Sequence, residues 1–189
     1  VIHAASKYLG GQSDTVAGLV TGSKAHIDRI NSEIYPYTGA KLAPFEAWLV
    51  LRNLETLPFR MRHHHEAGLE VASWLKAHED VTNVMHPALG DHAGKRTFSG
   101  FGGLFSFEVS DRIDIADFVD ALRLIRIGVS WGGPESLVVP AKAALSISPE
   151  TNVFARFGVS DRTIRLNVGL HSARDIIADI EQALVASKR

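Results

Sequence analysis

The stretch Ser6-Lys7-Tyr8-Leu9-Gly10-Gly11-Gln12-Ser13-Asp14 is the part of the sequence that indicates most about the fold of this chain. It follows the apolar run Val1–Ala5, which predicts a strand that ends just before the lysine. The glycines at positions 10 and 11 would let the backbone turn tightly. An amine held at the end of a strand in partial desolvation has a lowered pKa, so its neutral, nucleophilic form is populated. Lys7 is therefore placed where it could capture an aldehyde, although most lysines after strands are solvated charges.

Five positions of this stretch match a known motif. They resemble the lysine segment of the pyridoxal-phosphate (PLP) enzymes of cysteine and methionine metabolism, usually Ser-x-Thr-Lys-Tyr-x-x-Gly-His-Ser-Asp, at Lys7, Tyr8, Gly11, Ser13 and Asp14. The resemblance implies that Lys7 binds PLP as a Schiff base and acts as the catalytic base. It also implies that hydroxyls one and three residues before the lysine bind the cofactor phosphate. Ser6 keeps one of these hydroxyls, whereas Ala4 cannot supply the other.

Three further motifs follow in the order that this family shows. They are Ser99–Phe107, which looks like its glycine-rich strand entry, Ser130–Leu137, which resembles Ser-x-Gly-Gly-x-Glu-Ser-Leu, and Thr163–Leu170, which resembles its C-terminal arginine strand. Four motifs in the same order are far more specific than any one of them. The resemblance therefore covers essentially the whole chain.

The arginine strand predicts a carboxylate site. Residues 163–170 alternate, so that Arg165, Asn167 and Gly169 share the face opposite the apolar side chains. An arginine fixed there can hold a carboxylate through two parallel hydrogen bonds. The resemblance assigns Arg165 to the substrate α-carboxylate, with Ser130 and the backbone at Trp131 beside it. A solvated arginine and a tryptophan that only packs in the core are the alternative interpretations.

The resemblance implies an α/β fold, the C-terminal part of a fold-type I PLP-dependent transferase. Residues 1–57 would complete a PLP-binding domain and begin a linking helix, and residues 58–189 would form a small C-terminal α/β domain. Apolar residues at three-to-four spacing predict helix between residues 42 and 78, with Pro44 in a first turn and Pro58 at a break.

Local patterns predict the remaining elements. Residues 1–5 and 17–21 are expected to be short buried strands, and residues 105–109 alternate like a strand with one buried face. Asp114 is expected to cap one helix, and Ser172 with Asp175 resembles a capping box for the last helix.

The parent enzyme is expected to be a carbon–sulfur β-lyase that converts cystathionine to homocysteine, pyruvate and ammonia. Trp131 supports this reading, because Ser-Trp-Gly-Gly resembles bacterial cystathionine β-lyases, whereas γ-synthases and γ-lyases usually have leucine or valine there. A γ-lyase, γ-synthase or sulfhydrylase of the same family is the nearest alternative. A non-catalytic fragment that lacks most of the cofactor site is another.

Composition limits the other function classes. The 189 residues carry a formal net charge of −1, which gives no electrostatic reason to expect nucleic acid. There is no apolar run of the roughly 20 residues that span a bilayer, and no signal segment opens the chain, so we expect a cytoplasmic protein without membrane contact. Without cysteine there are no disulfides and no thiol catalysis.

Adjacent helical side chains point about 100° apart, so His63-His64-His65 is not expected to bind a metal.

The first residue is valine rather than methionine. Members of the family carry about as much chain again before the PLP lysine. We therefore expect this chain to be a C-terminal portion of such an enzyme. Its expected partners are an amino-acid substrate and either further copies, as in the family's tetramers, or the missing N-terminal half.

Overall fold

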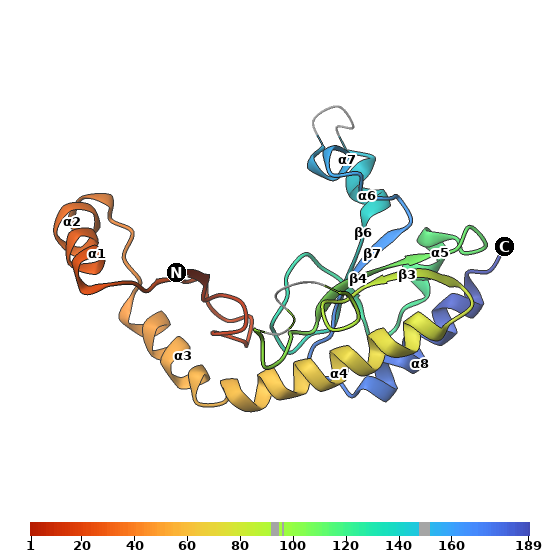
Figure 1. Cartoon of the computed structure of the whole chain (residues 1–189), viewed down its shortest axis with the longest axis horizontal. Coiled ribbons are helices and arrows are strands. Elements are labelled where there is room, and N and C mark those ends of the chain that lie inside the picture. The colour runs from red at the N-terminus through yellow and green to blue at the C-terminus, as the bar shows by residue number, and fades with distance from the viewer. Residues whose placement is uncertain (92–94, 96, 148–151) are drawn as a thin grey trace. The chain divides into compact units, whose positions relative to one another are not determined.

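The computed structural model describes residues 1–91, 95, 97–147 and 152–189 (Figure 1). The chain divides into two compact units, Val1–Pro58 and Phe59–Arg189. The assignment of residues 1–57 to a PLP-binding domain and of residues 58–189 to a C-terminal domain stays a prediction.

The first unit contains a two-stranded antiparallel sheet and a series of helices. Its elements are β1 (Ile2–Ala4), β2 (Gly18–Val20), α1 (Lys24–Arg29), the π-helix η1 (Ile30–Ile34), α2 (Tyr35–Thr38) and α3 (Pro44–Leu54). The two strands lie where the apolar runs predicted them, with Ile2 paired to Val20. The prediction that they are buried was wrong, because all their residues are exposed. A sheet of two strands offers no second layer against which such side chains could pack.

The helices at residues 24–38 were not predicted. Their local end signals are nonetheless regular: Ser23 caps α1 by accepting the His26 N–H, and Gly39 ends α2 with a φ of 64°. None of the residues in α1, η1 and α2 is buried, although Ile27, Ile30 and Ile34 follow one another at helical spacing in the sequence. In α3, Pro44 occupies the first turn as predicted.

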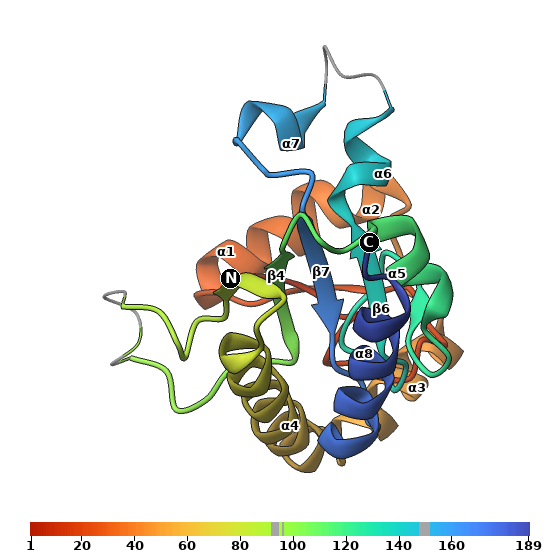
Figure 2. The ribbon, with the colours of Figure 1, turned by 90° about the vertical axis from the view of Figure 1, so that its right-hand side faces the viewer.

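The second unit is a five-stranded sheet with helices packed on one face (Figure 2). The strand order is β3-β4-β7-β6-β5, and only the pair β5–β6 is parallel among these strands. The elements are α4 (Leu57–Ala77), β3 (Val81–Met85), β4 (Leu104–Val109), α5 (Ile115–Ala121), β5 (Arg126–Ile127), β6 (Leu137–Pro140), α6 (Ala141–Leu145), α7 (Val153–Arg156), β7 (Thr163–Asn167) and α8 (Ala173–Ala186). The helix break expected at Pro58 lies just before it, between α3 and α4.

A single hydrophobic core joins the sheet to α4, α5 and α8. It includes Leu75 of α4, Phe107 of β4, Phe118 of α5, Ile164 of β7 and Ile180 of α8, each at most 1% exposed. β4 alternates between half-buried and buried residues, as the sequence pattern predicted. The core-facing side chains thus leave the alternate residues of β4 and β7 on the opposite face of the sheet.

Both predicted helix caps are confirmed. The Asp114 carboxylate accepts the N–H groups of Ala116 and Asp117 at the start of α5. Ser172 Oγ accepts the Asp175 N–H at 3.1 Å at the start of α8. These bonds satisfy donors that the first helical turn would leave without partners.

Candidate functional site

Lys7 lies in a tight turn between β1 and β2. Its N–H donates to the carbonyl of Ala4 at 3.1 Å, and its own carbonyl accepts the Gly11 N–H at 2.7 Å. Gly11 has a φ of 65°, and a Cβ on Gly10 would lie 2.8 Å from the Ala5 carbonyl oxygen. The glycine pair is therefore needed for this turn, which fixes the backbone of a half-buried lysine.

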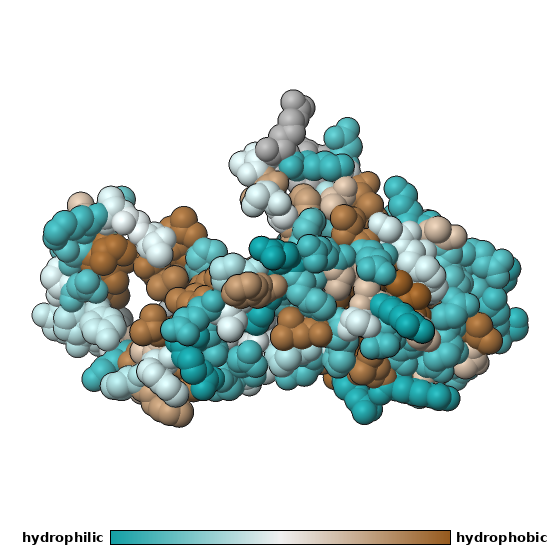
Figure 3. All heavy atoms as spheres, turned by 90° about the horizontal axis from the view of Figure 1, so that it is seen from below, coloured by the Kyte–Doolittle hydropathy of each residue, from teal (hydrophilic) through white to brown (hydrophobic). Residues whose placement is uncertain are grey.

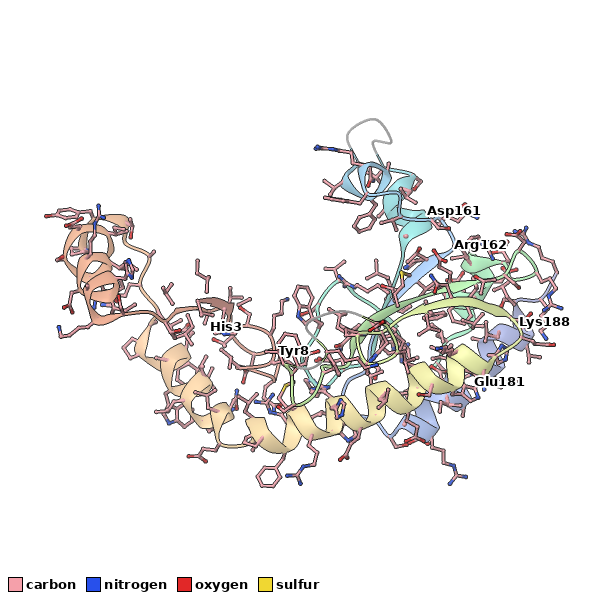
Figure 4. The ribbon with its side chains drawn as sticks, viewed as in Figure 1. His3, Tyr8, Asp161, Arg162, Glu181 and Lys188 are labelled. Carbon is pink, nitrogen blue, oxygen red and sulfur yellow. The ribbon has the colours of Figure 1, made fainter. Side chains whose placement is uncertain are left out.

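The hydroxyl of Ser6 holds the same turn. It donates to the Ala17 carbonyl at 3.2 Å and accepts the Ala17 N–H at 2.8 Å, just before β2. A hydroxyl has a single proton, so donation to a phosphate would require Ser6 to release the Ala17 carbonyl. Its role in phosphate binding stays a prediction. Figure 4 labels Tyr8, which follows Lys7 in this turn.

Arg165 projects from β7 in the second unit, where it meets the segment after β5. Its Nη2 donates to the Val129 carbonyl at 2.7 Å, and the centre of its guanidinium lies 5.6 Å from the centroid of the Trp131 ring. Arg165 is half-buried, and this desolvation lowers the pKa of its guanidinium below the usual value. The structure thus brings Arg165 and Trp131 together. In the sequence, Ser130 lies between Val129 and Trp131, which supply the two groups that contact the guanidinium.

A cavity of about 360 Å³ borders Arg165 on the face of the sheet opposite α4, α5 and α8. Ser106 and Glu108 of β4 line it together with Phe154 and Phe157 from the α7 region. A small organic molecule fits a volume of this size. The arginine is therefore accessible from the open face rather than sealed beneath the helices.

The three adjacent histidines of α4 have three different partners. His63 Nε2 donates to the His171 carbonyl at 3.1 Å, and the buried His64 donates from Nδ1 to the Val168 carbonyl at 2.9 Å. His65 Nδ1 instead accepts the Phe101 N–H at 3.2 Å. Burial lowers the pKa of His64, although its bond to the carbonyl opposes this effect. Among the described residues no group of three potential ligands is arranged to bind a metal ion.

Buried polar residues at the end of β7 were not singled out by sequence reasoning. Asn167 bonds to the backbone of Gly132 and Glu135, and Ser136 Oγ accepts the Gly169 N–H at 3.0 Å and lies 2.9 Å from His171 Nδ1. The only signal was the placement of Asn167 on the same face as Arg165. Its partners lie 32 and 35 residues away in the sequence, and only the fold brings them together.

Comparison with known proteins decides the family. The model of the Cys/Met metabolism PLP-dependent enzymes matches residues 1–185. The chain belongs to this family. A cystathionine beta-lyase of Lactococcus lactis subsp. cremoris (strain MG1363) is 38% identical over 97% of this chain and 50% of the relative. Cystathionine gamma-synthase 1 of Arabidopsis thaliana, a chloroplastic protein, is 35% identical over 98% of this chain and 34% of the relative.

A solved structure has the same fold. The crystal structure of cystathionine gamma-lyase from Lactobacillus plantarum, complexed with L-serine, matches with a TM-score of 0.88 at 35% identity. The match covers 99% of this chain and 50% of that one, which confirms the predicted α/β fold as part of a PLP-dependent enzyme. The chain spans half the length, or less, of these relatives. Among the described residues no helix is long and apolar enough to cross a membrane.

PLP is the cofactor of this family, and the side-chain amine of Lys7 in the first unit has the chemistry to bind it. PLP is an aldehyde, and Lys7 offers a primary amine from a turn in which Gly10 leaves no space for a side chain. When bound, PLP supplies an electron sink for a carbanion at the substrate Cα. Lys7 is the residue that would hold it in this chain.

Proposed function

We propose that the protein carrying this chain is a PLP-dependent carbon–sulfur β-lyase that cleaves cystathionine to homocysteine, pyruvate and ammonia. The observation that carries the proposal is the pairing of Arg165 with Trp131 on the open face of the sheet. A relative that is 38% identical over 97% of this chain is named a cystathionine beta-lyase. That relative and the arginine–tryptophan pair support the same reaction.

Arg165 would orient the substrate. Its guanidinium can donate two parallel hydrogen bonds to the α-carboxylate, while the Val129 carbonyl and the Trp131 ring limit its movement. Ser130, next to both, would help to seat the same carboxylate. A substrate fixed in this way presents its Cα–H bond in one direction, which favours proton removal.

Lys7 would move the proton. Its Nζ would accept the proton from Cα, and the electron pair left there would form the Cα–Cβ double bond as the Cβ–S bond breaks. The sulfur leaves with the bonding pair, and the Lys7 ammonium returns a proton to it to give homocysteine. Water then hydrolyses the remaining three-carbon enamine to pyruvate and ammonia. Atoms and electrons balance without an oxidant or reductant.

A γ-acting enzyme is the second candidate. The Arabidopsis thaliana relative and the Lactobacillus plantarum structure both carry names of γ-reactions at 35% identity. Trp131 is the observation against this candidate, because the sequences typical of γ-acting members have a smaller aliphatic residue there. The expected homo-oligomer and cytoplasmic location stay predictions.

The products of cystathionine distinguish these candidates. The purified, PLP-loaded protein should release pyruvate with homocysteine, identified by mass spectrometry. Release of 2-oxobutyrate with cysteine would indicate γ-elimination, and turnover of neither kind would exclude both lyases.

A variant tests the carboxylate site separately. Arg165→Lys keeps the charge but loses the two-bond geometry, so it should lower kcat/KM by the equivalent of roughly 2–4 kcal/mol. Arg174→Lys on the exposed surface of α8 is the matched control and should have normal kinetics. Unchanged kinetics in Arg165→Lys with an intact cofactor spectrum would place the carboxylate site elsewhere.

A further inference from the structure

Asn167 ends β7 two residues beyond Arg165 and is only 1% exposed. Its Oδ1 accepts the Gly132 N–H at 3.2 Å, and its Nδ2 donates to the Glu135 carbonyl at 2.9 Å. A single carboxamide therefore joins both ends of the loop Gly132–Glu135. A buried amide with both functions satisfied is a strong constraint, because breaking either bond leaves a buried polar group without a partner.

Two further bonds hold this loop against the chain that follows β7. The Leu170 N–H donates to the Pro134 carbonyl at 2.9 Å, and the Gly169 N–H donates to Ser136 Oγ at 3.0 Å. A Cβ on Gly169 would lie 2.3 Å from the Pro134 carbonyl oxygen. The absence of a side chain there allows the loop to approach closely enough for Asn167 to reach both of its ends.

Trp131 lies directly before the anchored loop. Gly132, whose N–H binds Asn167, is the next residue and has a φ of 78°, a conformation that favours glycine. The Trp131 ring lies over the Arg165 guanidinium, and Val129 supplies the carbonyl that accepts its hydrogen bond. The Val129 carbonyl and the Trp131 ring, which contact the guanidinium, thus both lie within residues 129–131, directly before Gly132.

We infer that Asn167 is a positioning residue for substrate recognition, because it fixes the segment that orients the Arg165 guanidinium. The inference rests on the proposed function, since it takes Arg165 to bind the substrate carboxylate. Asn167 acts through Trp131 and Val129 rather than on the substrate itself. A guanidinium that is already held in one orientation loses less conformational freedom when the carboxylate binds.

Two substitutions separate the functions of the amide. Asn167→Ala removes both hydrogen bonds, whereas Asn167→Asp keeps an oxygen toward Gly132 and sets an acceptor against the Glu135 carbonyl. Asn167→Ser replaces either variant if it does not fold. The matched control is Asn83→Ala on β3, which removes an exposed amide that bonds to Glu108.

The kinetic test uses the PLP-loaded protein that carries this chain. We expect Asn167→Ala to raise KM for cystathionine roughly tenfold, the cost of about one lost oriented contact. The visible cofactor spectrum should be preserved and kcat should change much less, while Asn83→Ala should leave all three unchanged. In an Arg165→Lys background Asn167→Ala should raise KM much less than it does alone, because the orientation it sets is already lost. Equal effects in both backgrounds, or an unchanged KM, would overturn the inference.

A spectroscopic test does not depend on catalysis. Trp48→Phe and Trp74→Phe leave Trp131 as the only tryptophan of this chain. Trp131 is half-buried, so release of the loop by Asn167→Ala should move its fluorescence to longer wavelength, whereas Asn83→Ala should not. An unmoved emission overturns the inference whatever the kinetics show. A moved emission with normal Arg165→Lys kinetics supports the loop anchor and overturns the proposed carboxylate site instead.

Discussion

The two units of this chain differ in how their apolar side chains are used. Val1–Pro58, all of it described by the structure, buries two hydrophobic side chains, Ala5 and Leu49. Phe59–Arg189 buries a continuous core that joins a five-stranded sheet to three helices. In the first unit large hydrophobic residues remain exposed, among them Ile2 at 81% and Phe45 at 65%.

The two candidate site residues therefore lie in units that differ in how they are stabilised. Lys7 is held by local backbone bonds in a unit that has little core, whereas Arg165 is held on a sheet with a core of its own. Hydrophobic residues are also visible at the surface in Figure 3, among hydrophilic ones. Burial of apolar area is the main favourable term in folding, so the second unit should determine the stability of this chain.

The largest expected effect comes from separating the units. A fragment that begins at Leu57 and ends at Arg189 keeps α4 and the whole core, so it should unfold in one cooperative thermal transition. Residues 1–56 should show no such transition, because two buried hydrophobic side chains cannot offset the entropy of ordering the chain. Circular dichroism melts of both fragments measure this. A cooperative transition in the short fragment would contradict the comparison.

The next prediction concerns a substitution that should remove the activity without lowering the stability of the chain. Lys7→Ala should abolish the reducible covalent PLP adduct and the β-elimination activity of the protein that carries this chain, while its melting temperature in the absence of PLP stays nearly unchanged. Lys24→Ala, which removes an exposed lysine paired with Asp28, should retain both. Absorbance spectra and borohydride reduction measure the adduct. If the adduct persists in Lys7→Ala, another amine binds the cofactor.

The third prediction concerns a core substitution that should lower the free energy of unfolding. Leu75→Ala removes a side chain that is 0% exposed in the second core, and it should lower the free energy of unfolding by about 2–5 kcal/mol. Leu51→Ala, at 66% exposure in α3, should change it by less than about 0.5 kcal/mol. Urea denaturation of both variants gives the values. Equal losses would mean that the first unit contributes a core of its own.

The sequence predicted both the position and the burial correctly for elements with one buried face. In β4 and α8 the apolar residues follow the period of the element, because those side chains meet the core on one side. The helices of residues 24–38 bury no residue, and they were missed although Ile27, Ile30 and Ile34 have helical spacing in the sequence. The predicted burial of β1 and β2 failed because apolar content indicates a tendency to be buried but not the presence of a covering layer.

The candidate site was predictable to the extent that it lies in short motifs. Lys7, Trp131 and Arg165 each lie within a run of residues that can be recognised locally. Asn167 lies in such a run too, but its role comes from partners in another loop. The contacts of Arg162, labelled in Figure 4, also join distant parts of the sequence. Its guanidinium donates to the carbonyls of Val109, Ser110 and Ile113. Contacts of this kind depend on the register of β7 against β4 and β6, which single-sequence patterns do not determine.

The smallest expected effect is electrostatic and lies in the second unit. The Arg189 guanidinium, together with the N–H groups at the start of α5, lowers the pKa of Asp114 from 3.8 to about 2. A carboxyl with a lowered folded pKa stabilises the fold above its unfolded pKa and loses that contribution as the pH falls through the folded value. The stabilisation by Asp114 should therefore be complete above about pH 4 and should disappear toward pH 2.

Asp114→Asn measures this contribution, because asparagine can still accept the cap hydrogen bonds but cannot pair as a charge with Arg189. Its melting temperature should lie below that of the unchanged chain at pH 5, and the two should converge as the pH approaches 2. Added salt should reduce the difference at pH 5, since the ion pair is at the surface. The same substitution at the exposed Asp161, labelled in Figure 4, should show no such convergence. A difference that persists at pH 2 would show that the cap hydrogen bonds, rather than the charge of Asp114, stabilise this helix.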